Sequence, residues 1–137
     1  MFVGSQRHFQ FSADFVSDSK GKHDVSIQWQ PLQANFLVIG SPHEKRLLLY
    51  DRQNQEVKEI PIPSTCSHLA WNRDGLLLAF VCLKDQATPL YMWSPYSQKI
   101  TGQELDSWNS GKVTWIGWSP TADVLAVAFN SGKNLIL

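Results

Sequence analysis

The residues of this sequence that could do chemistry include two Gly-Lys pairs, Gly111-Lys112 and Gly132-Lys133. Each pair resembles half of a phosphate-binding loop, in which backbone N–H groups and a lysine hold the phosphates. That loop also needs a glycine five residues before the pair and a Ser or Thr directly after the lysine. Neither lysine is followed by Ser or Thr. We therefore interpret both pairs as tight turns.

The histidines and cysteines do not form a recognisable metal or nucleophile site. His8, His23, His43 and His68 are scattered without the spacing of metal ligands. His68 opens a predicted strand, where it could line a central channel or, as we favour, bond a neighbouring backbone. Cys66 and Cys82 lie in or beside apolar segments and are expected to be buried free thiols in a reducing compartment. No cofactor, metal or catalytic residue is predicted.

Three apolar runs joined by two polar turns occupy the stretch from His68 to Ser94. The first turn, Asn72 to Gly75, predicts a hairpin, because Gly75 tolerates a positive φ and Asp74 can bond the local backbone. Leu76 to Cys82 is a continuous apolar run, typical of a strand buried on both faces. The third run, Pro89 to Trp93, completes three antiparallel strands.

The same pattern occurs once upstream and once downstream, and this repetition predicts the architecture. Trp29, Trp71 and Trp118 occupy equivalent places and lie 42 and 47 residues apart. A period in the forties with four strand-sized segments per unit is typical of a WD-type β-propeller, with about 40 to 45 residues per blade. The predicted fold class is therefore all-β, a partial propeller of about three blades.

The predicted boundaries follow from the repeats. Residues 1–24 are expected to supply an outer strand and a loop, 25–66 blade 1, 67–112 blade 2, and 113–137 an incomplete blade 3. Residues 55–62 and 96–101 are the predicted outer strands of blades 1 and 2. Because closed propellers use four to eight blades, we expect these residues to be the N-terminal part of a longer chain.

The tryptophans are predicted to be structural anchors. Trp29, Trp71 and Trp118 should each fill the space between neighbouring blades while the indole N–H donates to a backbone acceptor. Trp93, at the end of the third run, is assigned the same anchoring role. Trp108 lies in a polar segment, where it could contact a partner protein or cover a blade edge.

Composition excludes several classes of function. The 137 residues are 43% hydrophobic and carry 12 basic and 12 acidic side chains. Without a basic cluster, the chain lacks the surface that neutralises phosphates, so no nucleic-acid partner is predicted. No apolar stretch approaches the roughly 20 residues of a membrane helix, so no direct membrane span is expected.

The strand endings Tyr50-Asp51 and Trp93-Ser94 resemble degenerate forms of the Trp-Asp dipeptide of WD repeats. A longer series of residues resembles the first propeller of the WD repeat-containing protein nineteen family, subunits of intraflagellar transport complex A. The series includes Tyr50-Asp51-Arg52, Glu59-Ile60, Pro63, Cys66, Trp71, Asp74-Gly75, Leu78-Ala79, Trp118-Ser119 and Leu125-Ala126-Val127.

The resemblance implies a large non-enzymatic scaffold that acts in retrograde ciliary transport and in import of ciliary cargo. Its implied partners are other complex A subunits and ciliary membrane cargo adaptors, and its implied location is the cytoplasm, the cilium and the ciliary base. Two alternatives stay open. One is a WD-repeat adaptor of another vesicle-coat or trafficking complex; the other is a small-molecule or catalytic site in the central channel. The mostly apolar inner strands, without convergent carboxylates, weigh against catalysis.

Overall fold

The computed structural model describes residues 25–83, 89–104 and 111–137, which form eleven β-strands and no helix. Blade 1 is a sheet in the order β1-β2-β3-β4, with strands at Ser26–Trp29, Phe36–Gly40, Arg46–Asp51 and Glu56–Pro61. Blade 2 has the order β5-β6-β7-β8, with strands at Thr65–Trp71, Leu78–Leu83, Pro89–Trp93 and Ile100–Glu104. Blade 3 contains β9 (Val113–Trp118), β10 (Leu125–Phe129) and β11 (Asn134–Ile136). The all-β prediction is confirmed.

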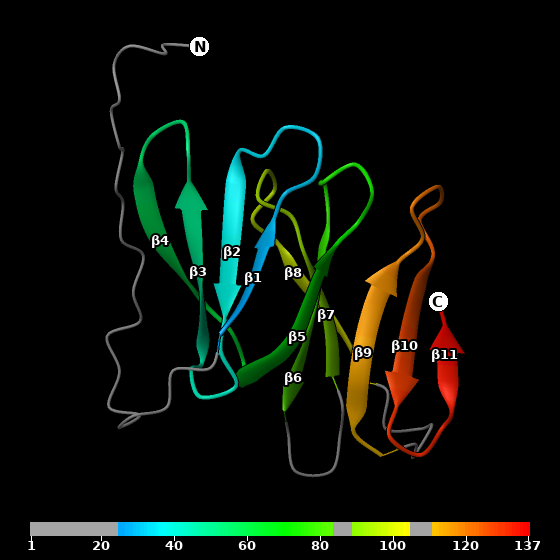
Figure 1. Cartoon of the computed structure of the whole chain (residues 1–137). Helices are drawn as coiled ribbons and strands as arrows, with labels where there is room; N and C mark the ends of the chain where they lie inside the picture. Colours follow the sequence, from blue (N-terminus) through cyan, green and yellow to red (C-terminus); the bar gives the residue numbers. More distant parts are fainter. Residues whose placement is uncertain (1–24, 84–88, 105–110) are drawn as a thin grey trace, which may run out of the picture.

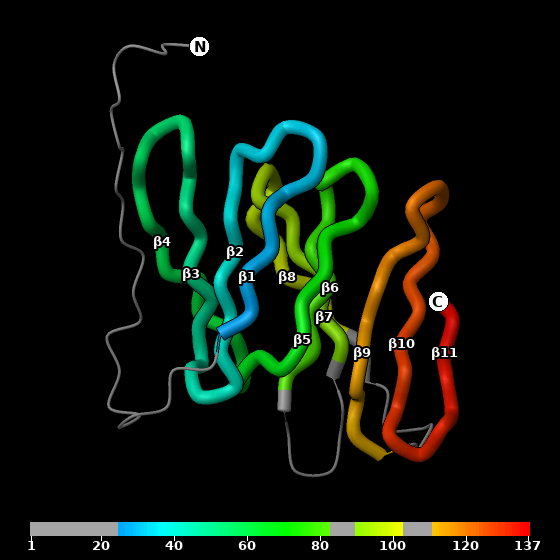
Figure 2. Tube along the Cα trace, in the orientation of Figure 1, coloured from blue at the N-terminus to red at the C-terminus, as the bar shows by residue number. Residues whose placement is uncertain are grey.

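The three sheets lie side by side, and each begins at the strand nearest its neighbours (Figure 1). The first strands, β1, β5 and β9, are in contact, β5 with both of the others. Each sheet is an antiparallel meander, and after β4 the chain returns to start the next sheet at β5 (Figure 2). Successive meanders that share a row of innermost strands form a sector of a β-propeller.

Strand β6 shows why the sheets stack. Its side chains alternate between the two faces, as in any strand. Leu78, Phe80 and Cys82 belong to the apolar core shared with blade 1, whereas Ala79 and Val81 belong to the core shared with blade 3. All five are essentially inaccessible to solvent. The continuous apolar run in the sequence is thus explained by burial on both faces, as predicted.

Two predicted boundaries differ from the observed strands. Strand β5 begins at Thr65, two residues before the predicted start of blade 2 at residue 67. The outer strand of blade 2 was predicted at 96–101, but β8 runs over Ile100–Glu104. Residues 95–99 instead form a turn, closed by a hydrogen bond of 2.8 Å from the Gln98 N–H to the Ser94 carbonyl oxygen. The predicted outer strand in residues 1–24 lies outside the described residues.

Candidate interaction surface at the seams between blades

A repeated indole hydrogen bond closes each seam between described blades. Trp71 in β5 donates from Nε1 to the carbonyl oxygen of Gln28 in β1, at 3.1 Å. Trp118 in β9 donates in the same way to the carbonyl oxygen of Ala70 in β5, at 3.0 Å. Each acceptor directly precedes the tryptophan of the previous blade. The indole therefore packs in the seam and also sets the register of one inner strand against the next.

The residues that follow Trp29 and Trp71 each make a second bond across the seam. Gln30, almost fully buried, donates from Nε2 to the carbonyl oxygen of Gly75 at 2.8 Å and to the Tyr96 hydroxyl at 3.0 Å. Asn72 donates from Nδ2 to Asp123 Oδ1 at 3.4 Å. Sequence reasoning missed both residues. The signal was present, because a polar side chain follows the tryptophan in all three repeats: Gln30, Asn72 and Ser119.

The other predicted anchors are placed as follows. Trp93 is buried in the core shared by blades 1 and 2. The φ of Gly75 is +76°, and the Asp74 carboxylate accepts a bond from the Leu76 N–H at 3.4 Å. Trp29, by contrast, is 49% exposed, because no described sheet packs against β1 on that side. The expectation that Trp29 fills a seam is therefore not met by the described residues. Trp108 lies outside them.

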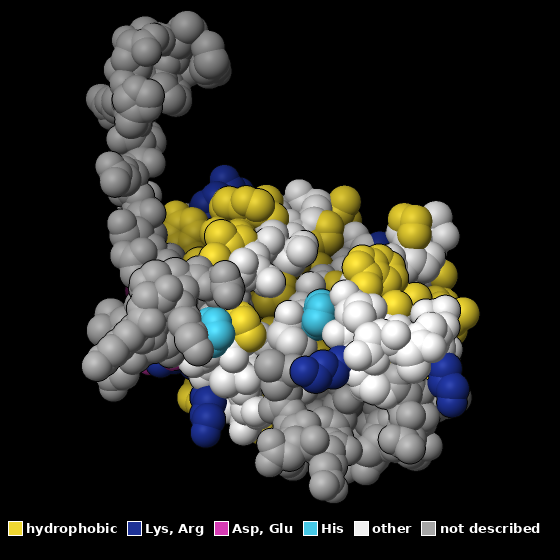
Figure 3. Space-filling view, turned by 60° about the horizontal axis from the view of Figure 1, so that its bottom comes forward, with side chains coloured by type: hydrophobic (Ala, Val, Ile, Leu, Met, Phe, Trp, Pro, Cys, Tyr) yellow, Lys and Arg dark blue, Asp and Glu magenta, His cyan; other side chains and the backbone are white. Residues whose placement is uncertain are grey.

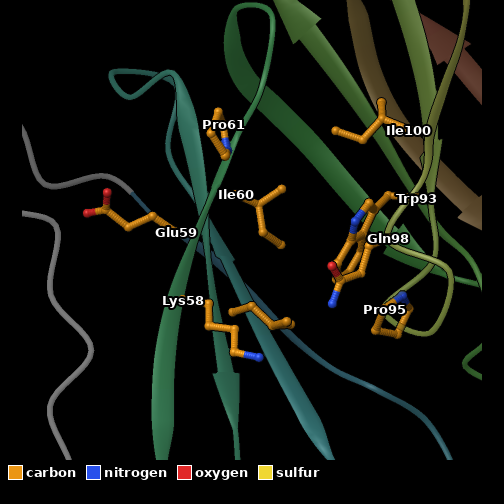
Figure 4. Close-up of a pocket in the computed structure, with 9 residues that line it drawn as sticks. Lys58, Glu59, Ile60, Pro61, Trp93, Pro95, Gln98 and Ile100 are labelled. Carbon is orange, nitrogen blue, oxygen red and sulfur yellow. The ribbon is translucent and has the colours of Figure 1, made fainter.

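A groove opens at the outer end of the seam between blades 1 and 2, with a volume of about 320 Å³. Figure 4 shows its two walls, β4 on one side and the end of β7 with the following turn on the other. We call it the blade 1–2 groove. It is lined by Leu49, Lys58, Glu59, Ile60 and Pro61 of blade 1 and by Trp93, Pro95, Gln98 and Ile100 of blade 2.

Contacts of Tyr96 attach the turn on the blade 2 wall of the groove to blade 1. Tyr96 accepts the Gln30 bond described above and packs edge-on against Phe36, with ring centroids 6.0 Å apart. The turn itself is closed by Ser94, whose hydroxyl accepts from the Tyr96 N–H at 3.2 Å. A turn of blade 2 is thereby attached to blade 1, so both walls belong to one packed unit.

The charge of the groove follows from strand alternation. Lys58 pairs with Leu49 across the β3–β4 ladder and therefore shares the face turned to blade 2. Glu59 points to the opposite face, where its carboxylate lies 3.2 Å from Arg46 Nε. In Figure 4 the Lys58 ammonium extends into the groove and Glu59 extends away from it. Of the charged lining residues, only the lysine faces the interior.

The side chains of His68, Cys66 and Cys82 have structural roles in the packing of the blades. His68 bonds the backbone of Thr114 in β9 and the Ser67 hydroxyl at 3.0 Å, and burial lowers the pKa of its ring. Burial raises the pKa of Cys66 to about 12 and that of Cys82 to about 11. Such thiols stay protonated and are poor nucleophiles at neutral pH. The described residues hold no cluster of three metal-ligating side chains.

Basic side chains do not gather into one patch on the face drawn in Figure 3, where Lys and Arg lie apart from one another. The part of the chain that the structure describes also holds no helix of the length and hydrophobicity that crossing a bilayer takes.

Antiparallel meanders joined by tryptophan seams around a common row of inner strands define a WD-type β-propeller, of which this chain forms a part. The family model described as the WDR19 first beta-propeller matches residues 25–137. The chain belongs to that family.

Two curated relatives, both called WD repeat-containing protein 19, come from Mus musculus and Homo sapiens. Each is 27% identical to the chain over 112 residues, or 82% of the chain. The chain spans only 8% of the length of these relatives.

Solved structures agree on the fold. The β-propeller domain of Cps50 (Swd1) from Myceliophteria thermophila has a TM-score of 0.64 at 16% identity, with 85% of this chain and 34% of that one covered. A chain of the Mitotic Checkpoint Complex has a TM-score of 0.62 at 19% identity, with 80% and 34% covered. At such identities the likeness concerns the fold alone. Since about a third of each propeller chain is matched, the prediction of a partial propeller is confirmed.

Proposed function

We propose that the chain is part of a non-enzymatic protein-interaction scaffold, a subunit of intraflagellar transport complex A that acts in retrograde ciliary transport and ciliary cargo import. The family match over residues 25–137 carries this proposal. Its partners would be other complex A subunits and ciliary membrane cargo adaptors, and it would work in the cytoplasm, the cilium and the ciliary base.

The chemistry of the described residues supports a scaffold. The buried polar side chains at the seams are used in bonds between blades: Gln30 reaches Gly75 and Tyr96, and Asn72 reaches Asp123. Both thiols have raised pKa values and His68 is bonded to a neighbouring blade. A frame whose seam side chains are bonded from blade to blade suits a protein that presents edges and loops to partners.

Affinity purification of the tagged full-length protein from ciliated cells tests the proposal. We expect co-purification of the other complex A subunits, and fluorescence of the tagged protein at the ciliary base and along the cilium. Recovery of vesicle-coat subunits without complex A subunits would instead support the adaptor alternative. A tagged full-length protein carrying Trp71→Ala is a useful control, because partners lost with the propeller fold are then separated from partners held by other parts of the molecule.

A further inference from the structure

The blade 1–2 groove has the size and chemistry of a binding site that the fold does not need. Its volume of about 320 Å³ falls at the lower end of the range for ligand pockets, about 300 to 1,000 Å³. That volume takes a few side chains rather than a folded domain. Trp71 and Gln30, which make the seam bonds, do not line the groove.

The interior of the groove is mainly apolar. Leu49 and Trp93 are buried at its base, each with less than a tenth of its surface exposed. Ile60 is partly buried on β4, and Ile100 on β8 is 38% exposed. These aliphatic and aromatic surfaces face one another across the groove (Figure 4). Burying a Leu-sized side chain between them would contribute about 1.5 to 3 kcal/mol of hydrophobic stabilisation.

Lys58 gives the groove its charge preference. Its ammonium extends into the groove, whereas the carboxylate of Glu59 is engaged with Arg46 on the opposite face. Lys58 makes no direct ion pair with the described residues, although its charge also acts on the Asp51 carboxylate at the end of β3. A carboxylate placed beside apolar side chains therefore finds a complementary charge there, and a basic ligand is repelled.

The walls favour an extended chain as the occupant. β4 and β8 are the last strands of their sheets, so alternate backbone N–H and C=O groups on each have no partner in their own sheet. Extended peptides bind at such edges, with backbone bonds for affinity and side-chain pockets for specificity.

We propose that the blade 1–2 groove binds an extended peptide segment of a partner protein, in which one or two large apolar side chains are followed by an Asp or Glu. The apolar side chains lie between Ile60, Trp93 and Ile100, and the carboxylate pairs with Lys58. The Gln98 side chain lines the same end and offers an amide to the peptide. The site goes beyond the proposed role in complex A and does not depend on it.

An array of capped octapeptides, probed with the full-length protein, tests the proposal. One set combines two neighbouring large apolar residues with Asp, and a matched set carries Lys in place of Asp. We expect the wild-type protein to bind the Asp set and not the Lys set. Lys58→Glu should weaken the Asp peptides about ten-fold, equal to about 1.4 kcal/mol, and should gain binding to the Lys set. Fluorescence polarisation with the best peptide of each set measures both changes.

Lys133→Glu is the matched control, because Lys133 lies in the β10–β11 turn of blade 3, outside the groove lining. It makes the same change in net charge and should leave both peptide sets unaffected. Ile100→Ala, on the groove wall, should weaken the Asp peptides without changing the charge preference. Thermal melting of each variant checks that the propeller is folded.

Equal binding of Asp and Lys peptides, no binding of either set by the folded wild-type protein, or equal effects of Lys58→Glu and Lys133→Glu would overturn the proposal. The same variants, expressed in ciliated cells, separate it from the proposed function. If Lys58→Glu does not change the preference from Asp to Lys peptides, and complex A subunits still co-purify, only the groove assignment is overturned. If Lys58→Glu does reverse the peptide preference, but complex A subunits do not co-purify, the groove assignment is supported and the complex A assignment is overturned.

Discussion

The side-chain amide of Gln30 in blade 1 donates a hydrogen bond of 2.8 Å to the carbonyl oxygen of Gly75 in blade 2. The same nitrogen reaches the Tyr96 hydroxyl, and the Gln30 carbonyl oxygen accepts from the Asn35 N–H at 3.1 Å. One buried side chain thus connects the β1–β2 turn of its own blade to two turns of the next. Because an unpaired buried amide would be costly, this network fixes how the two blades are stacked.

Gly75→Ala should destabilise the propeller more than Gly132→Ala. Both glycines have a positive φ, +76° and +89°, so either alanine is strained by about 1 to 2 kcal/mol. An added Cβ at Gly75 would also lie 2.7 Å from Gln30 Cγ, whereas at Gly132 it would meet nothing within 4 Å. Overpacking of this kind typically costs about 1 to 3 kcal/mol more. Chemical denaturation of the full-length protein compares the free energies of unfolding of the two variants. Equal losses of unfolding free energy would contradict the close packing at Gly75.

Trp71→Ala should lower the free energy of unfolding by about 3 to 5 kcal/mol, as truncation of a buried aromatic side chain does. The indole is buried in the core shared by blades 1 and 2 and is bonded to the Gln28 carbonyl oxygen. Trp71→Phe keeps an aromatic ring but removes the donor, so its effect should be smaller. Leu32→Ala, in an exposed loop position, is the surface control. Similar denaturation midpoints for Trp71→Ala and Leu32→Ala would refute the anchoring role.

Alkylation of Cys66 and Cys82 by iodoacetamide at pH 8 should be slow in the folded protein and fast in urea. Burial, the larger cause, raises the pKa of both thiols well above the ordinary 9.0, to about 12 and about 11, and only the thiolate reacts readily. Peptide mapping by mass spectrometry measures the two sites separately. Rapid labelling of either thiol without denaturant would show that it is accessible.

The same shifts predict a loss of stability at high pH. The thiols ionise more readily in the unfolded chain, so the stability they contribute is fully present below pH 9.0 and is lost as the pH rises from there toward the folded pKa values. Melting temperatures between pH 8 and pH 10.5 should fall less in the Cys66→Ala/Cys82→Ala variant than in wild type. If the melting temperatures of both proteins fall equally with pH, the loss of stability at high pH is caused by groups other than the two thiols.

Acid should weaken the seam between blades 2 and 3 through His68. Burial lowers the pKa of this ring below the ordinary 6.5, with the bond to the Thr114 backbone opposing the shift. Its contribution is therefore fully present above pH 6.5 and is lost as the pH falls through the folded-state pKa. The drop in melting temperature from pH 7.5 to pH 5.5 should be smaller for His68→Gln than for wild type. An unchanged drop would show that His68 does not carry the acid sensitivity.

The sequence alone determined the fold class, a partial β-propeller, and the place of most strands. Strand β6 was predictable because burial on both faces requires a continuous apolar run, and the recurring tryptophans marked equivalent places in the repeats. The start of β8 was predicted too early: residues 96–99 belong to the predicted outer strand, but bonds to serine hydroxyls and the Tyr96 contact to blade 1 hold them in a turn.

Only the tertiary structure decided which polar side chains join the blades and where a partner could bind. Gln30 and Gly75 are far apart in the sequence, and neither residue type indicates its partner. Trp29, Trp71 and Trp118 look alike in the sequence, yet their burial depends on whether a neighbouring sheet is packed against them. Lys58 becomes the charge of an apolar groove only because strand alternation turns it toward blade 2 and turns Glu59 toward Arg46. Such relationships arise from the stacking of sheets, which local sequence does not encode.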